Sequence, residues 1–407
     1  MPNAGGADDV ATAVADAALT WFQTTVPAKK HANNEHTVFS AIVLHQNEQF
    51  HVLSAGTGTK CVGRSGLCKD GYVLADSHAE AICRRSFLRY LYHDLQTPIE
   101  SSVLFEAADD GRRQIKPTCH LYMYISEAPC GDAALYDLND EALEEIHEAK
   151  LKRRKLDEQV TTVPCRTTGA KEAETTTHSN TLGLARVKSG RSDILESNRT
   201  VSMSCSDKLC KWLACGLQGR LLSQWFDPII LSGIVVSQDT QATPESLRHA
   251  LRRCFDRAGV DTCAVWTTAK QFPLVRSHAR TSASGLSLNW AALGTTDTDV
   301  EYTLGARGVK MGAKKKLDGA AKLKMRSRLS RRVLMEAALA HQPTPSPADD
   351  DDDAASAIVP PNCLSYGQLK AVQTSYAALQ AAFLYRPAFR EWKGTPPGYD
   401  EFRVKSS

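Results

Sequence analysis

Two short segments carry side chains that could hold and use a metal ion. In DSHAEAICRR, His78 and Glu80 stand two residues apart where a helix is predicted to begin. In a first turn both side chains can point towards one spot, although in mid-helix they would diverge by about 200°. In APCGDA, Cys130 follows Pro129, which suits a first helical turn. Helix starts favour the thiolate that zinc needs. The two segments therefore predict a zinc site between two helix N-termini.

A third protein ligand has to come from elsewhere in the chain. H-x-E together with P-C-x-x-C is the signature of zinc-dependent nucleobase deaminases, but Ala133 stands where its last cysteine is expected. Cys205, in SMSCSDK, is the leading candidate for the third ligand. The alternative interpretation is a chance surface His-x-Glu pair among small buried thiols, and we favour buried thiols for the remaining cysteines.

Composition narrows the class of protein. The 407 residues are 42% hydrophobic and 23% charged, which predicts a folded core. Twelve cysteines are too sparse for a disulfide scaffold. The longest apolar run falls well short of the roughly 20 residues of a membrane span, and the first thirty residues lack a secretory signal. We therefore expect an intracellular protein, nuclear and/or cytoplasmic, without a membrane partner.

The pattern of hydrophobic residues predicts an α/β domain. A hairpin is expected around HQNEQ, a helix over 77–93, and a closing helix over 365–383 that opens with a capping box of Ser365 and Gln368. We divide the chain into an N-terminal helix (1–35) that packs on a single domain (36–407). Within that domain, 140–200 reads as a polar insertion and 342–357 as an acidic flexible loop.

Five motifs are similar to those of a known family. They are GTGTKC (56–61), DSHAEAICRRSFLRYL (76–91), PCGDA (129–133), the segment 203–223 that begins with MSCSDK, and SRLSR (327–331). Over roughly residues 36–402 the chain resembles the deaminase domain shared by the double-stranded-RNA adenosine deaminases and the tRNA-specific adenosine deaminase 1 family.

The resemblance implies a fold and a metal centre. The fold would be cytidine-deaminase-like, with three layers, a mixed central sheet, insertions and a C-terminal helical region. Zinc would be held by His78, Cys130 and Cys205, with water as fourth ligand and Glu80 as proton shuttle.

The substrate expected from the resemblance is tRNA. Only about 35 residues precede the deaminase region, fewer than a double-stranded-RNA-binding domain spanning about 16 base pairs requires. The tRNA enzyme is then the closer match, which implies conversion of adenosine-37, beside the anticodon of alanine tRNA, to inosine. Editing of other structured RNA and a catalytically silent module that binds zinc and RNA or inositol phosphate are the alternatives. A basic segment is a candidate RNA-contacting surface, or else a solvated loop or localisation signal; it includes Lys314, Lys315, Lys316, Lys322 and Lys324.

A second set of cations predicts a buried anion. Arg84 falls on an apolar helix stripe, and it would be costly to bury with Arg85 unless the two shared a negative group. The resemblance implies inositol hexakisphosphate; ordinary surface ion pairs are the alternative. Arg220 and Gln380 depart from the family pattern, which has a small polar residue and a lysine there. The matching positions are Arg84, Arg85, Lys208, Lys211, Trp212, Arg331, Tyr366, Lys370, Tyr376, Trp392 and Asp400.

Overall fold

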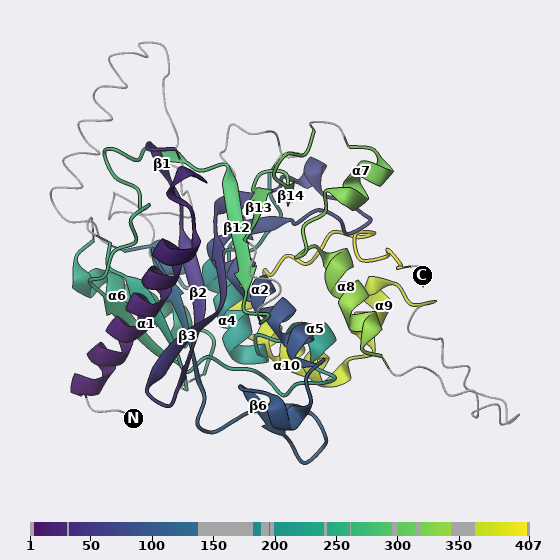
Figure 1. Cartoon of the computed structure of the whole chain (residues 1–407), viewed down its shortest axis with the longest axis horizontal. Helices are drawn as coiled ribbons and strands as arrows, with labels where there is room; N and C mark the ends of the chain where they lie inside the picture. Colours follow the sequence, from purple (N-terminus) through teal and green to yellow (C-terminus); the bar gives the residue numbers. More distant parts are fainter. Residues whose placement is uncertain are drawn as a thin grey trace, which may run out of the picture.

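An eight-stranded mixed sheet forms the centre of the computed structural model (Figure 1). Its strand order is β10-β9-β8-β2-β3-β12-β13-β14; β8, β9 and β10 run parallel, and every other neighbouring pair is antiparallel. The bounds are β2 Phe39–Gln46, β3 Gln49–Thr57, β8 His120–Ile125, β9 Gly233–Ser237, β10 Ala264–Thr268, β12 Leu286–Ala291, β13 Glu301–Leu304 and β14 Val309–Lys310. The predicted hairpin around HQNEQ is the β2–β3 pair.

The structure describes most of the chain, but several predicted segments lie outside it. Most of the predicted insertion 140–200, residues 343–357, Lys315 and Lys316 are among the residues not described. The described residues are 4–30, 32–136, 182–188, 195, 199–200, 201–239, 242–260, 262–294, 300–314, 317–342 and 363–404. None of the helices within these ranges has the length and apolar character that crossing a bilayer requires.

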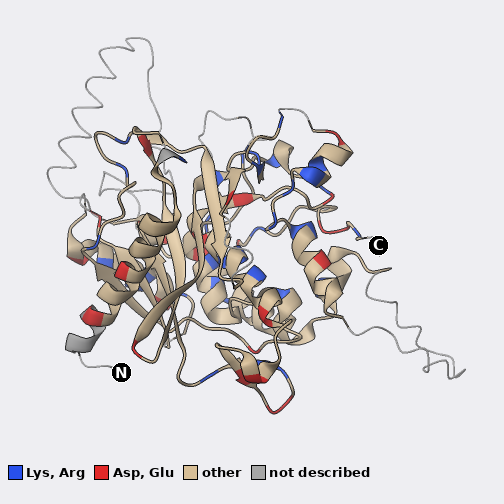
Figure 2. Ribbon diagram, in the orientation of Figure 1, with Lys and Arg blue, Asp and Glu red and all other residues tan. Residues whose placement is uncertain are grey.

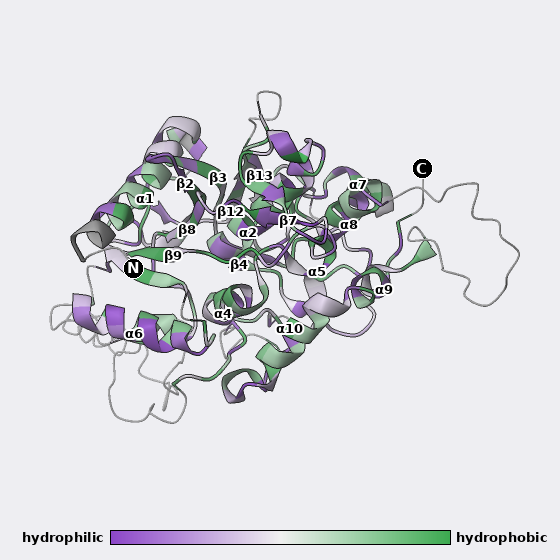
Figure 3. Cartoon of the chain, turned by 90° about the horizontal axis from the view of Figure 1, so that it is seen from below, coloured by the Kyte–Doolittle hydropathy of each residue, from purple (hydrophilic) through white to green (hydrophobic). Residues whose placement is uncertain are grey.

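Helices cover both faces of the sheet. Helix α1 (Ala4–Thr25) packs on one face, where Trp21 stacks on Phe39 and Phe22 meets Phe272 edge-on. Helix α2 (Ala79–Asp94) packs on the opposite face against β2, β3 and β12. Strand β9, buried along its whole length, is mainly hydrophobic in Figure 3. The predicted three-layer α/β fold with a mixed sheet is therefore confirmed.

Close packing of α2 on β3 fixes the start of that helix. A Cβ at Gly56 would lie 2.5 Å from Ile82 Cγ2 and 2.7 Å from the Cys83 nitrogen, so a larger residue there would push the helix away. Beside it, β4 (Thr59–Cys61) pairs with β5 (Asp76–His78), which runs directly into α2. The GTGTKC motif thus positions the first turn of α2, through the close packing of Gly56 and the pairing of β4 with β5.

The remaining helices surround α2 and the edge of the sheet. They are α4 (Cys205–Cys215), α5 (Gly219–Leu222), α6 (Pro244–Asp256), α7 (Gly319–Lys324), α8 (Arg331–Ala340), α9 (Tyr366–Ala371) and α10 (Thr374–Tyr385). Three two-stranded sheets complete the described elements: β4–β5, β1 (Glu35–His36) with β11 (Ser282–Ala283), and β6 (Phe105–Ala107) with β7 (Arg113–Ile115).

The closing helix is two helices rather than the predicted one. The capping box of Ser365 and Gln368 begins α9 as expected, but the helix ends before Gln373, whose ψ of 82° is not helical. Leu369 and Tyr376 are both buried, whereas Val372 is exposed. The apolar periodicity therefore predicted the buried Leu369, Tyr376 and Phe383 correctly, but it also included Val372 and Leu379, which are exposed, and it ran across the break between the two helices.

Candidate metal centre

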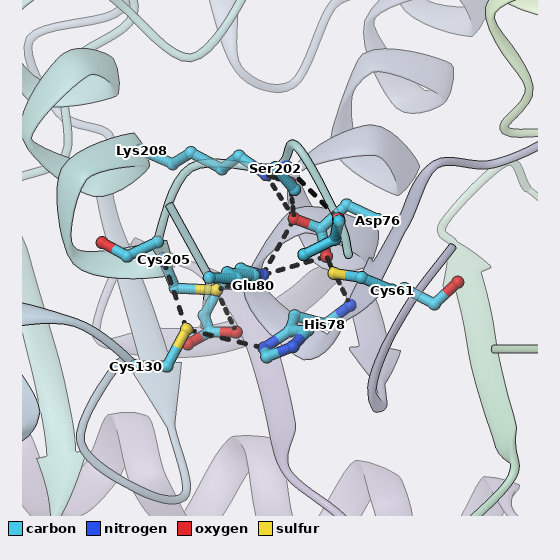
Figure 4. A network of polar contacts seen from close by, with 12 residues as sticks. Cys61, Asp76, His78, Glu80, Cys130, Ser202, Cys205 and Lys208 are labelled. Carbon is cyan, nitrogen blue, oxygen red and sulfur yellow. Dashed lines mark hydrogen bonds and ion pairs between the residues drawn. The ribbon is translucent and has the colours of Figure 1, made fainter. Parts of the chain in front are cut away.

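The structure brings the three predicted metal ligands together. His78, Cys130 and Cys205 each offer a ligand atom, and these atoms lie within 4.8 Å of one another. Cys130 Sγ is 3.7 Å from His78 Nδ1 and accepts the Cys205 N–H at 3.4 Å. Figure 4 shows the two sulfurs and the imidazole converging on one point. One imidazole and two thiolates suit zinc and leave a fourth position for water or substrate, as in catalytic zinc sites.

Two helix starts flank the cluster, but one of them is not the predicted one. His78 is the N-cap of α2, and Cys205 is the first residue of α4, which Ser204 caps by accepting the Asp207 N–H. Cys130 instead precedes a single 3₁₀ turn, η4 (Asp132–Ala134). Pro129 was thus misinterpreted as a sign of an α-helix, because the backbone is not helical at Gly131 (φ 109°) before the turn or at Leu135 (φ −98°, ψ 92°) after it.

A glycine allows the loop of Cys130 to approach α4. Gly131 has a φ of 109°, and a Cβ at this position would lie 2.3 Å from Ser204 Oγ. Ser206 ties the two segments together, since its N–H donates to the Cys130 carbonyl at 3.0 Å and its hydroxyl donates to the Pro129 carbonyl at 3.0 Å. These contacts hold two cysteines that are 75 residues apart in sequence within metal-binding distance.

Glu80 lies beside the cluster without being one of the three grouped ligands. It occupies the first turn of α2 and is 2% exposed. Its Oε2 accepts a hydrogen bond from Cys205 Sγ at 3.1 Å. Burial, followed by the nearby Cys130 sulfur, raises the pKa of the Glu80 carboxyl above its ordinary value. A carboxyl with a raised pKa holds a proton more readily, as a group that acts in turn as base and acid must.

A buried lysine joins the cluster to an aspartate. Lys188 Nζ lies 3.1 Å from Cys205 Sγ and donates to the two carboxylate oxygens of Asp76 at 2.9 and 2.8 Å. Although burial opposes the charged form, Asp76 and the nearby sulfurs raise the pKa of Lys188 well above its ordinary value. The ammonium therefore stays charged and can stabilise a thiolate at Cys205.

Asp76 is the acceptor on which this network centres. It also accepts hydrogen bonds from Ser202 Oγ at 2.9 Å, from the His78 N–H at 3.0 Å and from Cys61 Sγ at 3.1 Å, and it forms an ion pair with Lys208. Burial opposes the charge on Asp76, but Lys188 and Lys208 together hold its pKa well below the ordinary value. Asp76 thereby holds the backbone of His78, the N-cap residue of α2.

Lys188 was missed by sequence reasoning, whereas the place of Cys205 in a helix could have been found. Lys188 lies in a polar stretch with no hydrophobic periodicity, so nothing local marks it as buried. By contrast, Ser204 and Asp207 form an S-x-x-D pattern that marks a helix start. Of the other cysteines predicted to be buried, Cys363 is exposed and Cys165 lies outside the described residues.

The predicted anion ligands gather behind the metal centre. Arg84 lies over the Trp212 ring, Lys211 lies over the Trp392 ring, and Lys370 lies over the Tyr366 ring, at 5.3, 5.3 and 4.9 Å from the centroids. Lys208 of the same predicted set points instead to Asp76 and so connects this region to the metal centre.

The carboxylate of Asp400 in this region is already paired with two of the cations. Asp400 forms an ion pair with Lys370 at 3.1 Å and another with Arg331. Arg84, Arg85 and Lys211 form no ion pair with an acid in the described part of the chain. Arg84 and Arg85 donate instead to the carbonyls of Leu217 and Leu329. Burial lowers the pKa of Arg84 to about 10 and that of Lys211 to about 8, as expected for buried cations without a counter-ion. The cluster therefore fits a polyanion.

The three predicted RNA-contacting lysines that the structure describes lie on the surface near α7. Lys314 and Lys324 are exposed and Lys322 is partly exposed, and Figure 2 shows the basic residues on and beside α7. Asp318 caps this helix by accepting the Ala321 N–H at 2.7 Å. Arg307 braces the preceding loop by donating to the Ala313 carbonyl at 2.9 Å. These contacts fix the backbone that carries Lys314, Lys322 and Lys324.

Comparison of the sequence with those of known proteins identifies the family of this chain. The adenosine-deaminase (editase) domain matches residues 54–396. tRNA-specific adenosine deaminase 1 of Drosophila melanogaster is 34% identical over 60% of this chain and 59% of its own length. The mouse protein of that name is 26% identical over 86% of this chain and 88% of its own. The Drosophila double-stranded RNA-specific editase Adar is 28% identical over 69% of this chain, which spans 41% of that relative. Since the domain match covers most of the residues, including all those of the metal centre, this chain belongs to the adenosine-deaminase (editase) domain family.

Proposed function

We propose that this chain is an enzyme that catalyses the zinc-dependent hydrolytic deamination of adenosine to inosine in RNA. The observation that carries the proposal is the buried carboxylate of Glu80, 3.1 Å from Cys205 Sγ and beside the three grouped ligands. A structural zinc site is closed by four protein ligands and needs no such carboxylate, whereas a catalytic site keeps one position open. His78, Cys130 and Cys205 would hold the metal.

The chemistry moves two protons of the attacking water, first one to N1 of the purine and then the other to the departing amino group. When bound, zinc lowers the pKa of water towards neutrality and so supplies a nucleophile for C6 of adenine. Glu80 accepts the proton of the attacking water on a carboxylate oxygen and delivers it to N1 as C6 becomes tetrahedral. It then assists departure of the amino group, so one water is consumed and inosine and ammonia are formed.

We propose tRNA as the substrate, with adenosine-37 of alanine tRNA as the favoured site. Support comes from the relatives named tRNA-specific adenosine deaminase 1, which align over most of this chain in mouse and human. A target in an anticodon loop is cheaper to unstack than one in a duplex. The exposed Lys314 and Lys324 offer contacts to the phosphates of the remaining tRNA.

The test compares two substrates and two proteins. Purified wild type and Glu80→Gln are incubated with alanine tRNA carrying adenosine-37 and with a long RNA duplex, and nucleosides are quantified after digestion. Inosine from wild type with the tRNA alone supports the proposal in full. Inosine from the duplex alone replaces the tRNA assignment. Absence of inosine from both substrates contradicts the catalytic role and favours a silent binding module.

We also propose that inositol hexakisphosphate is enclosed behind the metal centre as a structural cofactor. Arg84, Arg85 and Lys211 supply cationic donors without acidic partners in the described residues, and Trp212 and Trp392 cover two of them. Leaving such groups unpaired costs several kcal/mol, on the order of 3–5 for each uncompensated buried charge. A compact polyphosphate can pair with several of them at once.

A further inference from the structure

Arg220 lies at the edge of this cation cluster without a partner that explains it. It belongs to α5, a short helix that contacts α8, α9 and α10. Its Nε is fully buried and has no hydrogen-bond partner in the described part of the chain. The preceding Gly219 packs so closely on Arg84 that a Cβ there would lie 2.4 Å from Arg84 Nη2. Helix α5 therefore places the guanidinium of Arg220 near another cation, Arg84, and not near an acid of the described residues.

Arg220 interacts electrostatically with groups of the cluster. Its charge is among those that lower the pKa of Lys211, after burial, Arg84 and Lys370. Its charge also opposes the effect of burial on Tyr376, whose pKa is raised to about 12. Lys211 belongs to α4 and Tyr376 to α10, so groups on both helices are within electrostatic reach of Arg220. Repulsion from Arg84 and Lys211 would drive the Arg220 guanidinium away unless an anion lay near these cations.

We propose that Arg220 is a further ligand of the bound polyphosphate, donating from its guanidinium to a phosphate group. This inference rests on the proposed enclosure of inositol hexakisphosphate and adds a ligand from α5. Arginine offers five donors in a planar fork that matches phosphate oxygens, so one residue can satisfy its buried Nε and make a second bond at once. The contact would fasten α5 to α4 and α10 through the anion.

The chain also offers a position from which the charge could be replaced. Gln380 lies four residues after Tyr376 on α10, on the same face of the helix, and is partly buried. A lysine at 380 would bring an ammonium to the side of the cluster that Tyr376 lines. The double variant R220Q/Q380K therefore keeps the net charge while moving one positive charge from α5 to α10.

The experiment measures bound polyphosphate directly. Wild type, R220Q, R220K, R220Q/Q380K and the control R248Q, which removes an exposed arginine on α6, are dialysed at moderate salt. Zinc and inositol hexakisphosphate per chain are then quantified after acid denaturation. Melting temperatures are recorded against added inositol hexakisphosphate. We expect R220Q to bind about 10- to 100-fold more weakly, as for a lost charge-assisted hydrogen bond, and added ligand to restore its melting temperature. R220K and the double variant should be intermediate, and R248Q unchanged.

The possible outcomes separate this inference from the proposed cofactor. A wild type that carries no polyphosphate and does not respond to it overturns both. Equal retention and equal melting temperatures in wild type and R220Q overturn the role of Arg220 alone. A less stable R220Q that does not respond to added ligand indicates a purely structural arginine and also overturns it. If R220Q fails to fold, R220K decides the matter: weaker binding of inositol hexakisphosphate than in wild type supports the inference, and binding equal to wild type overturns it.

Discussion

Replacing Lys188 by methionine tests whether the buried ammonium supports the metal centre. Methionine fills most of the space of lysine without its charge, so packing is largely kept. The substitution removes the donor that lies 2.9 and 2.8 Å from the Asp76 oxygens and 3.1 Å from Cys205 Sγ. Asp76 keeps Lys208, Ser202, Cys61 and the His78 N–H as partners.

The loss of stability in K188M depends on the partners that Asp76 keeps. Breaking a buried ion pair by removing one partner costs about 3–5 kcal/mol when the other charge is left without compensation. Because Lys208 still neutralises Asp76, we expect the free energy of unfolding to fall by about 3 kcal/mol, the lower end of this range. Cys205 loses the donor that stabilises its thiolate, and loss of such a supporting contact typically weakens metal binding by about 10- to 100-fold.

Two measurements check this prediction. Urea unfolding of the zinc-loaded protein gives the free energy, and competition with a chromophoric chelator gives the zinc affinity. The matched control is Lys188→Met combined with Asp76→Asn, which removes both charges and should recover part of the loss, with a coupling energy of about 0.5–3 kcal/mol. The reasoning would be refuted if the free energy of unfolding of K188M lay within about 0.5 kcal/mol of that of wild type and its zinc affinity were unchanged.

Further predictions concern catalysis, metal content, packing and pH. Glu80→Gln should lower the rate of inosine formation by about 10²- to 10⁴-fold with zinc content unchanged; a drop below tenfold would exclude the proton-transfer role. Cys205→Ser should abolish stoichiometric zinc in metal analysis, while Cys210→Ser, on the same helix, should retain it. Gly56→Val should lower the melting temperature because its side chain would enter α2, at a cost of about 1–3 kcal/mol or more; an unchanged melting temperature would argue against this close packing. Since the pKa of Lys211 is lowered from 10.5 to about 8, the unfolded chain binds more protons between these values, so polyphosphate-free protein should gain stability as pH rises from about 8 to 10.5. Lys211→Met should remove that gain in pH-dependent urea titrations; a gain that persists in the variant would assign the effect to other groups.

Local sequence patterns predicted the elements that their own side chains stabilise. The β2–β3 hairpin, the start of α2 at His78 and the capping box at Ser365 each depend on residues a few positions apart. The H-x-E spacing places His78 and Glu80 in one helical turn, so half of the candidate site is a property of a single segment.

The rest of the site depends on contacts across the fold. Cys205 meets Cys130 because Gly131 allows the two loops to approach, and Lys188 is buried only because Asp76 and Cys205 surround it. No periodicity encodes such contacts, since they join residues that are 17 to 112 positions apart. The second helix start lies at Cys205 and not at Cys130 as predicted, and here a local signal was available in the S-x-x-D pattern of Ser204 and Asp207.

The sequence by itself thus determined which residue types were present and which short segments would be helix or strand, because those preferences act over one or two turns. The sequence also named the two thiols, Cys130 and Cys205, but only the tertiary structure brought them to His78, added Lys188 beside them and placed Arg220 near other cations. Burial and charge compensation are properties of the packed chain, so their consequences become visible only once the layers are assembled.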